Sequence, residues 1–541
     1  MGAISVPARR HAIVVVGSGP VGLTLANLLG CEGIDVLLVE RNAATVTEPR
    51  AVSIDDEALR TMQAAGLIEP VLKEIVPGYG SHYFSPAGRC FIRVEPTETP
   101  NGYPRRNAFR QPVLERQLQE GLRRFPHVTC LYGWELSQVT PAADQVIAKI
   151  RGSTGQLLQI DCDFLIGCDG ASSTVREQLG ILMEGETFSE RWLIVDLEES
   201  HNTTRHTKVF CDARRPCITL PGPHDTRRFE FKLFAHERDA DMLAPRMIRQ
   251  LLDTHEADPR AVIRRSVVYR FHARCAMRWS QGRVFLAGDA AHLTPPFAGQ
   301  GFNSGVRDCH NLAWKLAMAL RRQAGPQLLA TYEQERRVHA RAMIELALRM
   351  GRVMAPRNRL SGLLTRLCFY TLGVIPTARV YIAQMRYRPP PRFKQGFIIP
   401  AAARRPHPLV GRLFPQPLLR DLQGRNLRLD ELIGNRFALL AWTEQPQRFF
   451  LASEHDIWRR LEAVRVAVVP ERLAITPIDQ QLIVKPTDST LAQAFHGRSE
   501  RAVLLRPDHY VAAEGSVDQL NAVAQQVSAL LEQTWGSPSS L

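Results

Sequence analysis

The stretch AIVVVGSGPVGLTLANLLGCEGIDVLLVER, residues 12–41, decides the expected fold. An apolar run of strand type leads into a glycine-rich turn, then a helical run, and then a second strand-like run. Gly17, Gly19 and Gly22 fit G-x-G-x-x-G, whose glycines allow a tight turn, close approach of a pyrophosphate and close helix packing. Glu40 ends the second strand, where a carboxylate can accept hydrogen bonds from an adenosine ribose. The stretch therefore predicts a Rossmann-type unit that binds the ADP part of a dinucleotide, either NAD or FAD.

Two later stretches have the same strand–turn–helix pattern. In FLIGCDGASSTVREQLG (164–180), Asp169 follows an apolar run and precedes a glycine, an arrangement that is also common in ordinary turns. In GDAAHLTPPFAGQGFNSG (288–305), Asp289 ends a strand and can accept hydrogen bonds from a polyol such as a ribityl chain. The turn then opens a helix near Gly301, and the positive end of a helix suits the N1–C2=O edge of a reduced flavin. The three motifs in this order favour FAD.

The composition is typical of a large globular protein. Its 541 residues are too many for one core, so two or three domains are expected. The net charge is +14, and only seven of the 68 basic residues are lysine. The charge is spread out and lacks interleaved aromatic side chains, so no nucleic-acid partner is expected. Residues 346–420 contain no Asp or Glu. We interpret them as a solvated surface, with a dimer face or an attraction for anionic substrates as alternatives.

Cysteine and hydropathy patterns bear on metal binding and on the compartment. The ten cysteines are scattered, with no Cys-x-x-Cys and no His/Cys cluster of zinc spacing. No metal site is therefore expected. The scattered, unpaired cysteines indicate a reducing compartment. The apolar run that follows Arg9 and Arg10 is broken after five residues, and no run reaches transmembrane length. These patterns predict a soluble, cytoplasmic protein without a membrane partner.

Several long strings of the sequence resemble one enzyme family. The strings are IDDEALRTMQAAGL (54–67), YPRRNAFRQP (103–112), RRFEF (227–231), GQGFNSGVRDCHNLAWKLA (299–317), TYEQERRVHA (331–340) and LLRPDHYVAA (504–513). Together with the three motifs, they resemble the FAD-dependent aromatic hydroxylases of the p-hydroxybenzoate hydroxylase fold, and among these the 3-(3-hydroxyphenyl)propionate hydroxylases. The resemblance covers nearly the whole chain. It implies an α/β fold with a Rossmann-type FAD-binding domain, an inserted antiparallel-sheet substrate domain and a C-terminal thioredoxin-like domain.

The resemblance also implies contacts with FAD. Arg50 resembles an arginine that touches the FAD diphosphate, and Gln111 resembles a glutamine along the ribityl and pyrophosphate region. Asp169 resembles an aspartate linked to FAD and to the nicotinamide cofactor, and Asp289 resembles the ribityl-binding aspartate. The expected FAD contacts are Val16, Gly17, Ser18, Gly19, Pro20, Val21, Gly22, Glu40, Arg41, Arg50, Gln111, Asp169, Gly288, Asp289, Ala290, Pro296, Gly299, Gly301, Phe302 and Asn303.

The substrate side is expected to come from a sheet between the second and third motifs. Short alternating runs in residues 186–269 are typical of antiparallel strands, and residues 78–103 are expected to add to them. The polar candidates in these segments are His82, Tyr83, Arg215, His224 and Arg228. We take His82, His224 and Arg228 as the catalytic candidates, with a structural or solvated role as the alternative for each. Arg228 is of interest because a guanidinium suits a carboxylate on the substrate, and no residue is assigned to the phenol proton.

The expected domain organisation follows from the same resemblance. Residues 1–185 are the first part of the FAD-binding domain, with 78–103 contributing to the substrate lid, and 186–269 are the substrate-binding sheet. Residues 270–400 are the second part of the FAD-binding domain with a helical section. Residues 401–541 are the thioredoxin-like domain, which lacks cysteine and therefore cannot perform thioredoxin chemistry, so packing or a homodimer contact is expected. No second nucleotide-binding motif follows, so NADH, or alternatively NADPH, is expected to visit the flavin transiently.

The resemblance implies a monooxygenase that hydroxylates a phenolic ring ortho to its hydroxyl with O2 and NADH. The expected substrates are 3-(3-hydroxyphenyl)propanoate and 3-hydroxycinnamate, which would give 2,3-dihydroxy products in aromatic catabolism. The turn PPFAGQG (295–301) departs from the PVWQGQG more usual in the propionate hydroxylases. Hydroxylation of a polycyclic or polyketide phenol is therefore the first alternative. A flavin-binding protein without turnover is the second.

Overall fold

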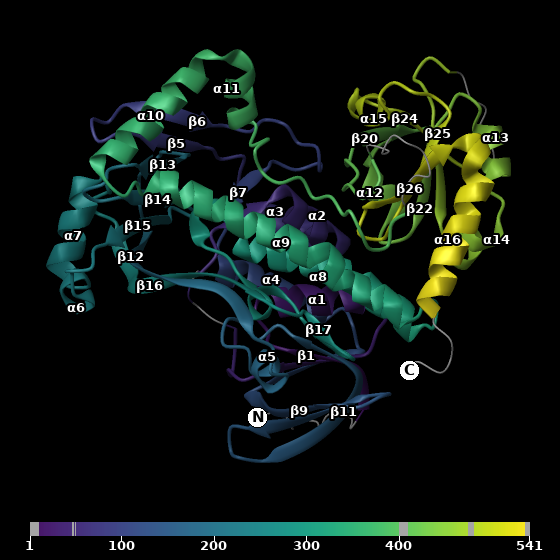
Figure 1. Ribbon diagram of the computed structural model, residues 1–541, viewed down its shortest axis with the longest axis horizontal. Helices are drawn as coiled ribbons and strands as arrows, with labels where there is room; N and C mark the ends of the chain where they lie inside the picture. The colour runs from purple at the N-terminus through teal and green to yellow at the C-terminus, as the bar shows by residue number, and fades with distance from the viewer. Residues whose placement is uncertain (1–9, 46–47, 49, 400–408, 474–480, 536–541) are drawn as a thin grey trace.

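The computed structural model describes residues 10–45, 48, 50–399, 409–473 and 481–535 of the 541. Within these residues the strands form three large sheets and one small sheet. In Figure 1 the first sheet lies at the bottom, the second on the left and the third on the right. The long helix α9 extends between the second and third sheets, across the middle of the molecule (Figure 1).

The first sheet contains the N-terminal motif. In spatial order its strands are β17 (Ser280–Gln281), β18 (Val284–Leu286), β11 (Leu157–Gly167), β1 (Arg10–Val16), β2 (Val36–Glu40) and β8 (Val128–Tyr132), with β10 (Val146–Gly152) and β9 (Trp134–Pro141) attached to β11. The strands from β18 to β8 are parallel, and Ile13, Val14 and Val15 of β1 are fully buried, as is usual for a sheet covered on both faces. Helix α1 (Pro20–Cys31) follows β1 and packs against α4 (Gln111–Leu122) and α8 (Gly301–Leu320). The turns after β1, β2 and β11 therefore meet at one edge of the sheet.

The second sheet is mostly antiparallel. In spatial order its strands are β19 (His292–Leu293), β16 (Val262–Ala276), β12 (Met183–Glu198), β15 (Arg227–Leu233), β14 (Cys217–Pro221), β13 (Thr207–Phe210), β5 (Ser81–Phe84) and β6 (Cys90–Val94). Strand β5 pairs in parallel with β13, which brings the 78–103 segment to this sheet. The boundaries expected near residues 186 and 269 fall inside β12 and β16, because these two long strands pair from one end to the other. Helices α6 (Asp239–Met242) and α7 (Pro245–Thr254) pack beside the sheet.

The third sheet is C-terminal. In spatial order its strands are β21 (Asn426–Arg428), β20 (Leu418–Asp421), β24 (Leu482–Pro486), β23 (Val464–Val468), β22 (Ala438–Trp442), β25 (Arg501–Leu505) and β26 (Val511–Ser516). Strands β22, β23 and β24 are parallel, whereas β25 and β26 form an antiparallel hairpin that leads into α16. Its helices are α12 (Leu429–Ile433), α13 (Pro446–Ala452), α14 (Asp456–Arg460), α15 (Thr490–Ala494) and α16 (Leu520–Trp535).

The remaining elements connect the sheets. The small sheet contains β3 (Ser53–Asp55), β7 (Arg106–Ala108) and β4 (Val76–Pro77). The other helices are α2 (Asp56–Ala64), α3 (Ile68–Lys73), α5 (Thr174–Gln178), α9 (Pro326–Met354), α10 (Arg359–Val374) and α11 (Pro376–Ala383). Among the described residues, no single helix has the length and hydropathy to cross a membrane, although α10 and α11, bent by 112° at their junction, meet those two criteria as a pair.

A buried network of charges joins the third sheet to α8 and α9. Arg506 lies after β25, and its guanidinium donates to both oxygens of Glu335 at 2.7 and 2.9 Å and to Asp508 at 2.9 and 2.5 Å. The Lys315 ammonium on α8 donates to Glu335 at 2.7 Å, and the Asn311 amide donates to Glu335 and Asp508. All five side chains are buried. The C-terminal sheet is therefore fixed to the helix that begins at the third motif.

Candidate active site

Two adjoining cavities lie between the first and second sheets. The larger, of about 390 Å³, extends to the strands of the second sheet. The smaller, of about 160 Å³, lies at the ends of β1 and β2. Gly19, Pro20, Arg50, Gln111 and Gly170 line both cavities, so the two share a wall. Together they form an elongated site that reaches from the N-terminal motif to the second sheet.

The three glycines of the N-terminal motif differ in whether the packing of the chain leaves room for a side chain. Gly17 has φ +101°, and a Cβ there would lie 2.5 Å from the carbonyl oxygen of Cys168. A Cβ on Gly22 would lie 1.9 Å from the carbonyl oxygen of Gly17, so both glycines are required by the packing of the chain itself. A Cβ on Gly19 would meet no atom within 4 Å. Gly19 is the N-cap residue of α1, and the space beside it is open to a bound molecule.

Glu40 is fixed at the wall of the smaller cavity. Its Oε2 accepts a hydrogen bond from the backbone N–H of Ser18 at 2.8 Å, and its Oε1 accepts from the backbone N–H of Asn42 at 2.9 Å. Val16 and Arg41 line the same cavity on either side of these contacts. A carboxylate has further lone pairs, so Glu40 can still accept hydrogen bonds from a ligand hydroxyl.

The second motif closes the smaller cavity and is tied to the third. Asp169 accepts hydrogen bonds from the Ser173 hydroxyl at 2.5 Å and from the Val175 N–H at 3.1 Å, and burial raises the pKa of its carboxyl. The Arg176 guanidinium, in the helix that follows, donates to the carbonyl oxygen of Ala290 at 3.1 Å. This bond connects the turn after β11 with the turn after β18.

The third motif presents a carboxyl group to the larger cavity. Gly288 has φ +61°, and its N–H donates to Asp308 at 3.1 Å, which fixes the start of the turn. The next side chain, Asp289, lines the larger cavity and is exposed to that space. Desolvation by the surrounding protein raises the pKa of Asp289, and His292 and Arg50 lower it in part.

Helix α8 begins at the wall of the larger cavity. Gly299 adopts the left-handed conformation, with φ +61°, and turns the chain into the helix at Gly301. Pro296, Gly299, Gly301 and Phe302 all line the larger cavity. The unpaired N–H groups of the first turn, with the positive end of the helix dipole, therefore lie beside this space.

Four of the expected FAD contacts, namely Gly22, Gly288, Ala290 and Asn303, do not line either cavity. Asn303 illustrates the reason, because its amide nitrogen donates to the carbonyl oxygens of Ser53 and Gly299 at 3.0 and 2.7 Å. Its amide oxygen accepts from the N–H of Asp55 at 3.0 Å. These hydrogen bonds hold the turn before α8, so Asn303 supports the cavity wall. Direct contact of the four residues with FAD stays a prediction.

Arg228 lies in the larger cavity but already has a partner. Its guanidinium donates to both oxygens of Asp196 at 2.7 and 3.2 Å and to the carbonyl oxygen of Arg50 at 2.8 Å. The charge expected to bind a substrate carboxylate is therefore compensated within the protein, and Arg228 holds the Arg50 segment in place. Gln111 also holds this segment in place, since its amide oxygen accepts a hydrogen bond from the N–H of Ala51 at 2.7 Å.

Glu230 lies two residues after Arg228 on β15, so the two side chains project from the same face of the strand. Both line the larger cavity, whereas Phe229 and Phe231 between and after them pack into a core on the opposite face. Glu230 is 6% exposed, and its carboxyl group has no hydrogen-bond partner among the residues that the structure describes. Burial raises its pKa to about 7, although Arg228 lowers it in part. A carboxyl with this pKa can take a proton from, or share one with, a hydroxyl group in the cavity.

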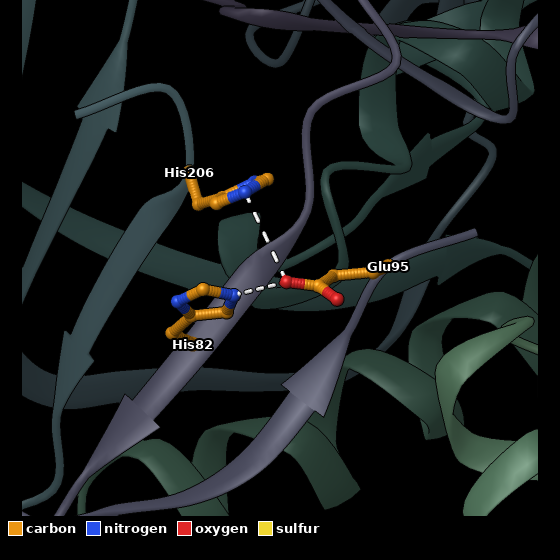
Figure 2. Close-up of side chains that lie close together, drawn as sticks. All are labelled: His82, Glu95 and His206. Atoms are coloured by element: carbon orange, nitrogen blue, oxygen red, sulfur yellow. Dashed lines mark hydrogen bonds and ion pairs between the residues drawn. The ribbon is translucent and has the colours of Figure 1, made fainter. Parts of the chain in front are cut away.

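His82 lies on the face of β5 away from the cavity. Ser81 and Tyr83, its neighbours along the strand, line the cavity. Figure 2 shows His82 with Glu95 and His206, and its Nε2 lies 2.6 Å from Glu95 Oε1. His206 Nδ1 accepts the N–H of Gly80 at 2.9 Å, so the neutral ring carries its proton on Nε2, the atom that faces Glu95. His82 is thus hydrogen-bonded to Glu95, and His206 Nε2 lies 3.9 Å from the same carboxylate oxygen. The position of His82 does not support the catalytic role expected for it, because its side chain does not line the cavity.

His224 also lies outside both cavities. Its side chain is 58% exposed, and its Nε2 lies 2.7 Å from the carboxylate of Glu74. Arg215, the remaining lid candidate, is paired with Glu237. The position of His224 does not support the catalytic role expected for it, because its side chain is largely exposed and does not line either cavity.

The polar residues of the larger cavity that the sequence left unassigned include Arg106, Glu230 and Tyr387. The sequence could have indicated Glu230, because residues two apart in a strand lie on the same face and Glu230 follows Arg228 by two. No comparable signal separates Arg106 from the neighbouring Arg105. The apolar part of the wall comes from Ile194, Ile218, Phe271, Phe297, Leu346, Met350, Met354 and Met385.

Comparison with known proteins agrees with this geometry. A family described as FAD binding domain matches residues 10–347, and one described as HcaD C-terminal domain matches residues 411–530. The chain is 38% identical over 533 residues to a protein of Klebsiella pneumoniae named 3-(3-hydroxy-phenyl)propionate/3-hydroxycinnamic acid hydroxylase, covering 97% of this chain and 96% of that protein. A Shigella sonnei protein of the same name is 38% identical over 534 residues, covering 98% and 96%.

The fold is similar to that of solved flavoprotein structures. The flavin-dependent monooxygenase PieE, solved in complex with FAD and substrate, has a TM-score of 0.80 at 22% identity, over 98% of this chain and all of that chain. This likeness confirms the mixed α/β fold with several sheets that the sequence predicts. The family match and the relatives establish more: the chain belongs to the FAD-dependent aromatic hydroxylases, in the family of the 3-(3-hydroxyphenyl)propionate/3-hydroxycinnamic acid hydroxylases.

Proposed function

We propose that the protein hydroxylates a phenolic ring ortho to its hydroxyl with O2 and NADH. The substrates proposed are 3-(3-hydroxyphenyl)propanoate and 3-hydroxycinnamate, the compounds in the names of the 38% identical relatives. The observation that carries the proposal is the pair of adjoining cavities, one at the dinucleotide motif and one between α8 and the second sheet. NADPH is the alternative reductant. A polycyclic phenol is the alternative substrate, favoured by the PPFAGQG turn (295–301).

The residues present at the two cavities fit FAD. The space beside Gly19 admits a pyrophosphate, Arg50 brings positive charge to the shared wall, and Asp289 projects toward the ribityl position. When bound and reduced by NADH, FAD would activate O2 for transfer of one oxygen atom to the ring. The apolar wall excludes water from the reacting ring, and Glu230 is placed to accept the phenol proton.

The same proposal covers the domain organisation. We infer that the first sheet and α8 form a Rossmann-type FAD-binding domain, with the second sheet as the substrate lid inserted between their segments. The parallel pair β22–β23 and the hairpin β25–β26, followed by α16, support a thioredoxin-like arrangement for the C-terminal part. Because this part lacks cysteine, its proposed role is structural.

The decisive experiment is turnover with a panel of phenols under labelled O2. Addition of one labelled oxygen atom to 3-(3-hydroxyphenyl)propanoate, with substrate-stimulated NADH oxidation, supports the proposal. Conversion of polycyclic phenols alone would select the alternative substrate class. An absence of substrate-stimulated NADH oxidation across the panel would indicate a flavin-binding protein without turnover.

The Gly19→Val variant is expected to fold but to lose bound FAD. The new side chain meets no protein atom within 4 Å at its Cβ, and it fills the space proposed for the pyrophosphate. Flavin absorbance per mole of protein and circular dichroism measure the two effects separately. A folded variant with full flavin occupancy would contradict the assignment of the smaller cavity.

The Asp289→Ala variant is expected to bind FAD about ten- to a hundredfold more weakly, because it loses charge-assisted hydrogen bonds from the ribityl chain. It is expected to purify pale and to recover turnover when FAD is added in excess, since Asp289 has no proposed role in proton transfer. Asp289→Asn keeps an acceptor and is expected to lose less affinity. Titration of each apoprotein with FAD gives the dissociation constants, and equal constants for the Ala variant and the parent would refute the contact.

A further inference from the structure

Arg106 of β7 presents a guanidinium to the larger cavity without a charged partner. The guanidinium donates hydrogen bonds to the Ser81 and Tyr79 hydroxyls, the second at 3.1 Å, and it lies 4.4 Å above the centre of the Tyr79 ring. Within the part of the chain that the structure describes, no carboxylate forms an ion pair with it. Its position is therefore fixed by neutral groups, while its charge stays uncompensated.

The other arginines of this cavity are already engaged. Arg228 is paired with Asp196, and Arg388 is paired with Asp55 and Glu57 at 2.7 Å each. Arg50 lines both cavities and is the residue proposed to meet the FAD diphosphate. Arg106 lines only the larger cavity, on the side of the second sheet. It is thus the cation that faces the substrate space and not the smaller cavity.

An unpaired guanidinium in an enclosed and largely apolar space is costly, because burial removes hydration that only an anion or several acceptors can replace. A guanidinium forms two parallel hydrogen bonds with a carboxylate, so a carboxylate ligand meets this requirement with defined geometry. The hydroxyl groups of Ser81 and Tyr79 hold the fork in place before a ligand arrives, which reduces the entropy lost on binding.

We propose that Arg106 binds the carboxylate of a phenolic acid substrate and so selects substrates with an anionic side chain. This rests on the proposed function, because it assumes that the larger cavity holds the phenol. The carboxylate lies at the Arg106 end of the cavity, and the phenolic hydroxyl lies toward Glu230. Arg106, and not Arg228, is then the specificity-determining arginine.

The test compares 3-(3-hydroxyphenyl)propanoate with its neutral amide in the FAD-loaded enzyme. The parent is expected to prefer the acid by at least about tenfold in kcat/KM. In Arg106→Gln, KM for the acid is expected to rise about ten- to a hundredfold, and the acid-to-amide preference is expected to disappear. Calorimetric titration of the oxidised, FAD-loaded protein with the acid is expected to show the same loss of affinity without turnover.

Two further variants distinguish a binding role from a structural one. Arg106→Lys keeps the charge but not the fork, so it is expected to retain part of the preference. Arg105→Gln is the matched control, because Arg105 is the adjacent arginine, is paired with Glu98 and does not line the cavity. It is expected to behave like the parent.

The outcomes separate this inference from the proposed function. A parent that turns over the acid and its amide equally, or an Arg106→Gln enzyme with full FAD content and an unchanged acid-to-amide ratio, overturns the role of Arg106 while the hydroxylase proposal stands. A parent that shows no phenol-stimulated NADH oxidation overturns the proposed function itself. If Arg106→Gln fails to hold FAD, Arg106→Lys decides the question. An acid-to-amide preference reduced below that of the parent supports the role of Arg106, and an unchanged preference overturns it.

Discussion

Replacement of Arg506 by methionine is expected to destabilise the FAD-loaded protein by about 3–5 kcal/mol, because it removes one partner from a buried network of charges. The guanidinium makes four hydrogen bonds, two to Glu335 and two to Asp508, and all three side chains are buried. Burial alone would raise the pKa of Asp508, but Arg506 outweighs it and lowers that pKa to about 2. Without Arg506, the donors left to the two buried carboxylates among the described residues are Lys315, Asn311 and the backbone N–H of Phe397.

Urea denaturation followed by fluorescence measures this change in the free energy of unfolding. The control is Arg448→Met, which removes an exposed ion pair with Asp518. Exposed pairs contribute about 0–1 kcal/mol, so this variant is expected to unfold close to the parent. An equal decrease in the free energy of unfolding in the two variants would show that the buried network stabilises the protein no more than an exposed ion pair does.

The Glu230→Gln variant is expected to be more stable than the parent at pH 8 by about 3 kcal/mol, and equal to it near pH 4.5. Burial raises the pKa of Glu230 from 4.5 in the unfolded chain to about 7 in the folded protein. The folded state therefore binds more protons than the unfolded state between these values, and the parent loses stability as the pH rises from about 4.5 to about 7. Each pKa unit corresponds to about 1.4 kcal/mol, and glutamine stays neutral throughout.

Thermal and urea unfolding of the substrate-free, FAD-loaded protein at pH 5 and pH 8 measure the effect. The matched control is Glu237→Gln, in the loop between β15 and α6. Burial raises the pKa of Glu237, but hydrogen bonds from Arg215 and the Phe234 N–H outweigh it and lower the pKa overall. The neutral residue is therefore expected to lower stability at pH 8. A Glu230→Gln variant whose stability tracks the parent at both pH values would contradict a raised pKa for Glu230.

The parts of the fold that could be predicted from sequence are those that follow local periodicity and motif spacing. The run from Ala12 to Arg41 forms its strand, turn, helix and second strand as expected, because apolar spacing and glycines determine each piece locally. The open space at Gly19 and the turn that begins at Gly288 also lie where the motifs put them. The limits of the substrate sheet were not predictable, since β12 and β16 gain their length from pairing with each other.

The substrate side of the cavity depends on strand orientation and on ion pairing across the chain. β5 reads SHYF and has no apolar alternation, so the sequence could not place Tyr83 inside and His82 outside. The sequence predicted that Arg228 binds a carboxylate of the substrate, but in the fold its guanidinium is paired with Asp196, 32 residues earlier. Arg106 and Arg105 are adjacent and alike in sequence, and only their tertiary partners distinguish them.

The link between the C-terminal sheet and α8 limits how the chain can be divided. Trp314 and Met318 of α8 belong to the same apolar core as Phe437 and Leu439, and Lys315 between them carries the ion network. The helix whose first turn lines the larger cavity thus packs against residues more than a hundred positions later in the chain. A chain shortened before this segment would expose the apolar side chains of Trp314 and Met318 and would leave Glu335 without the Arg506 guanidinium. The C-terminal part therefore stabilises the helix that begins at the wall of the larger cavity.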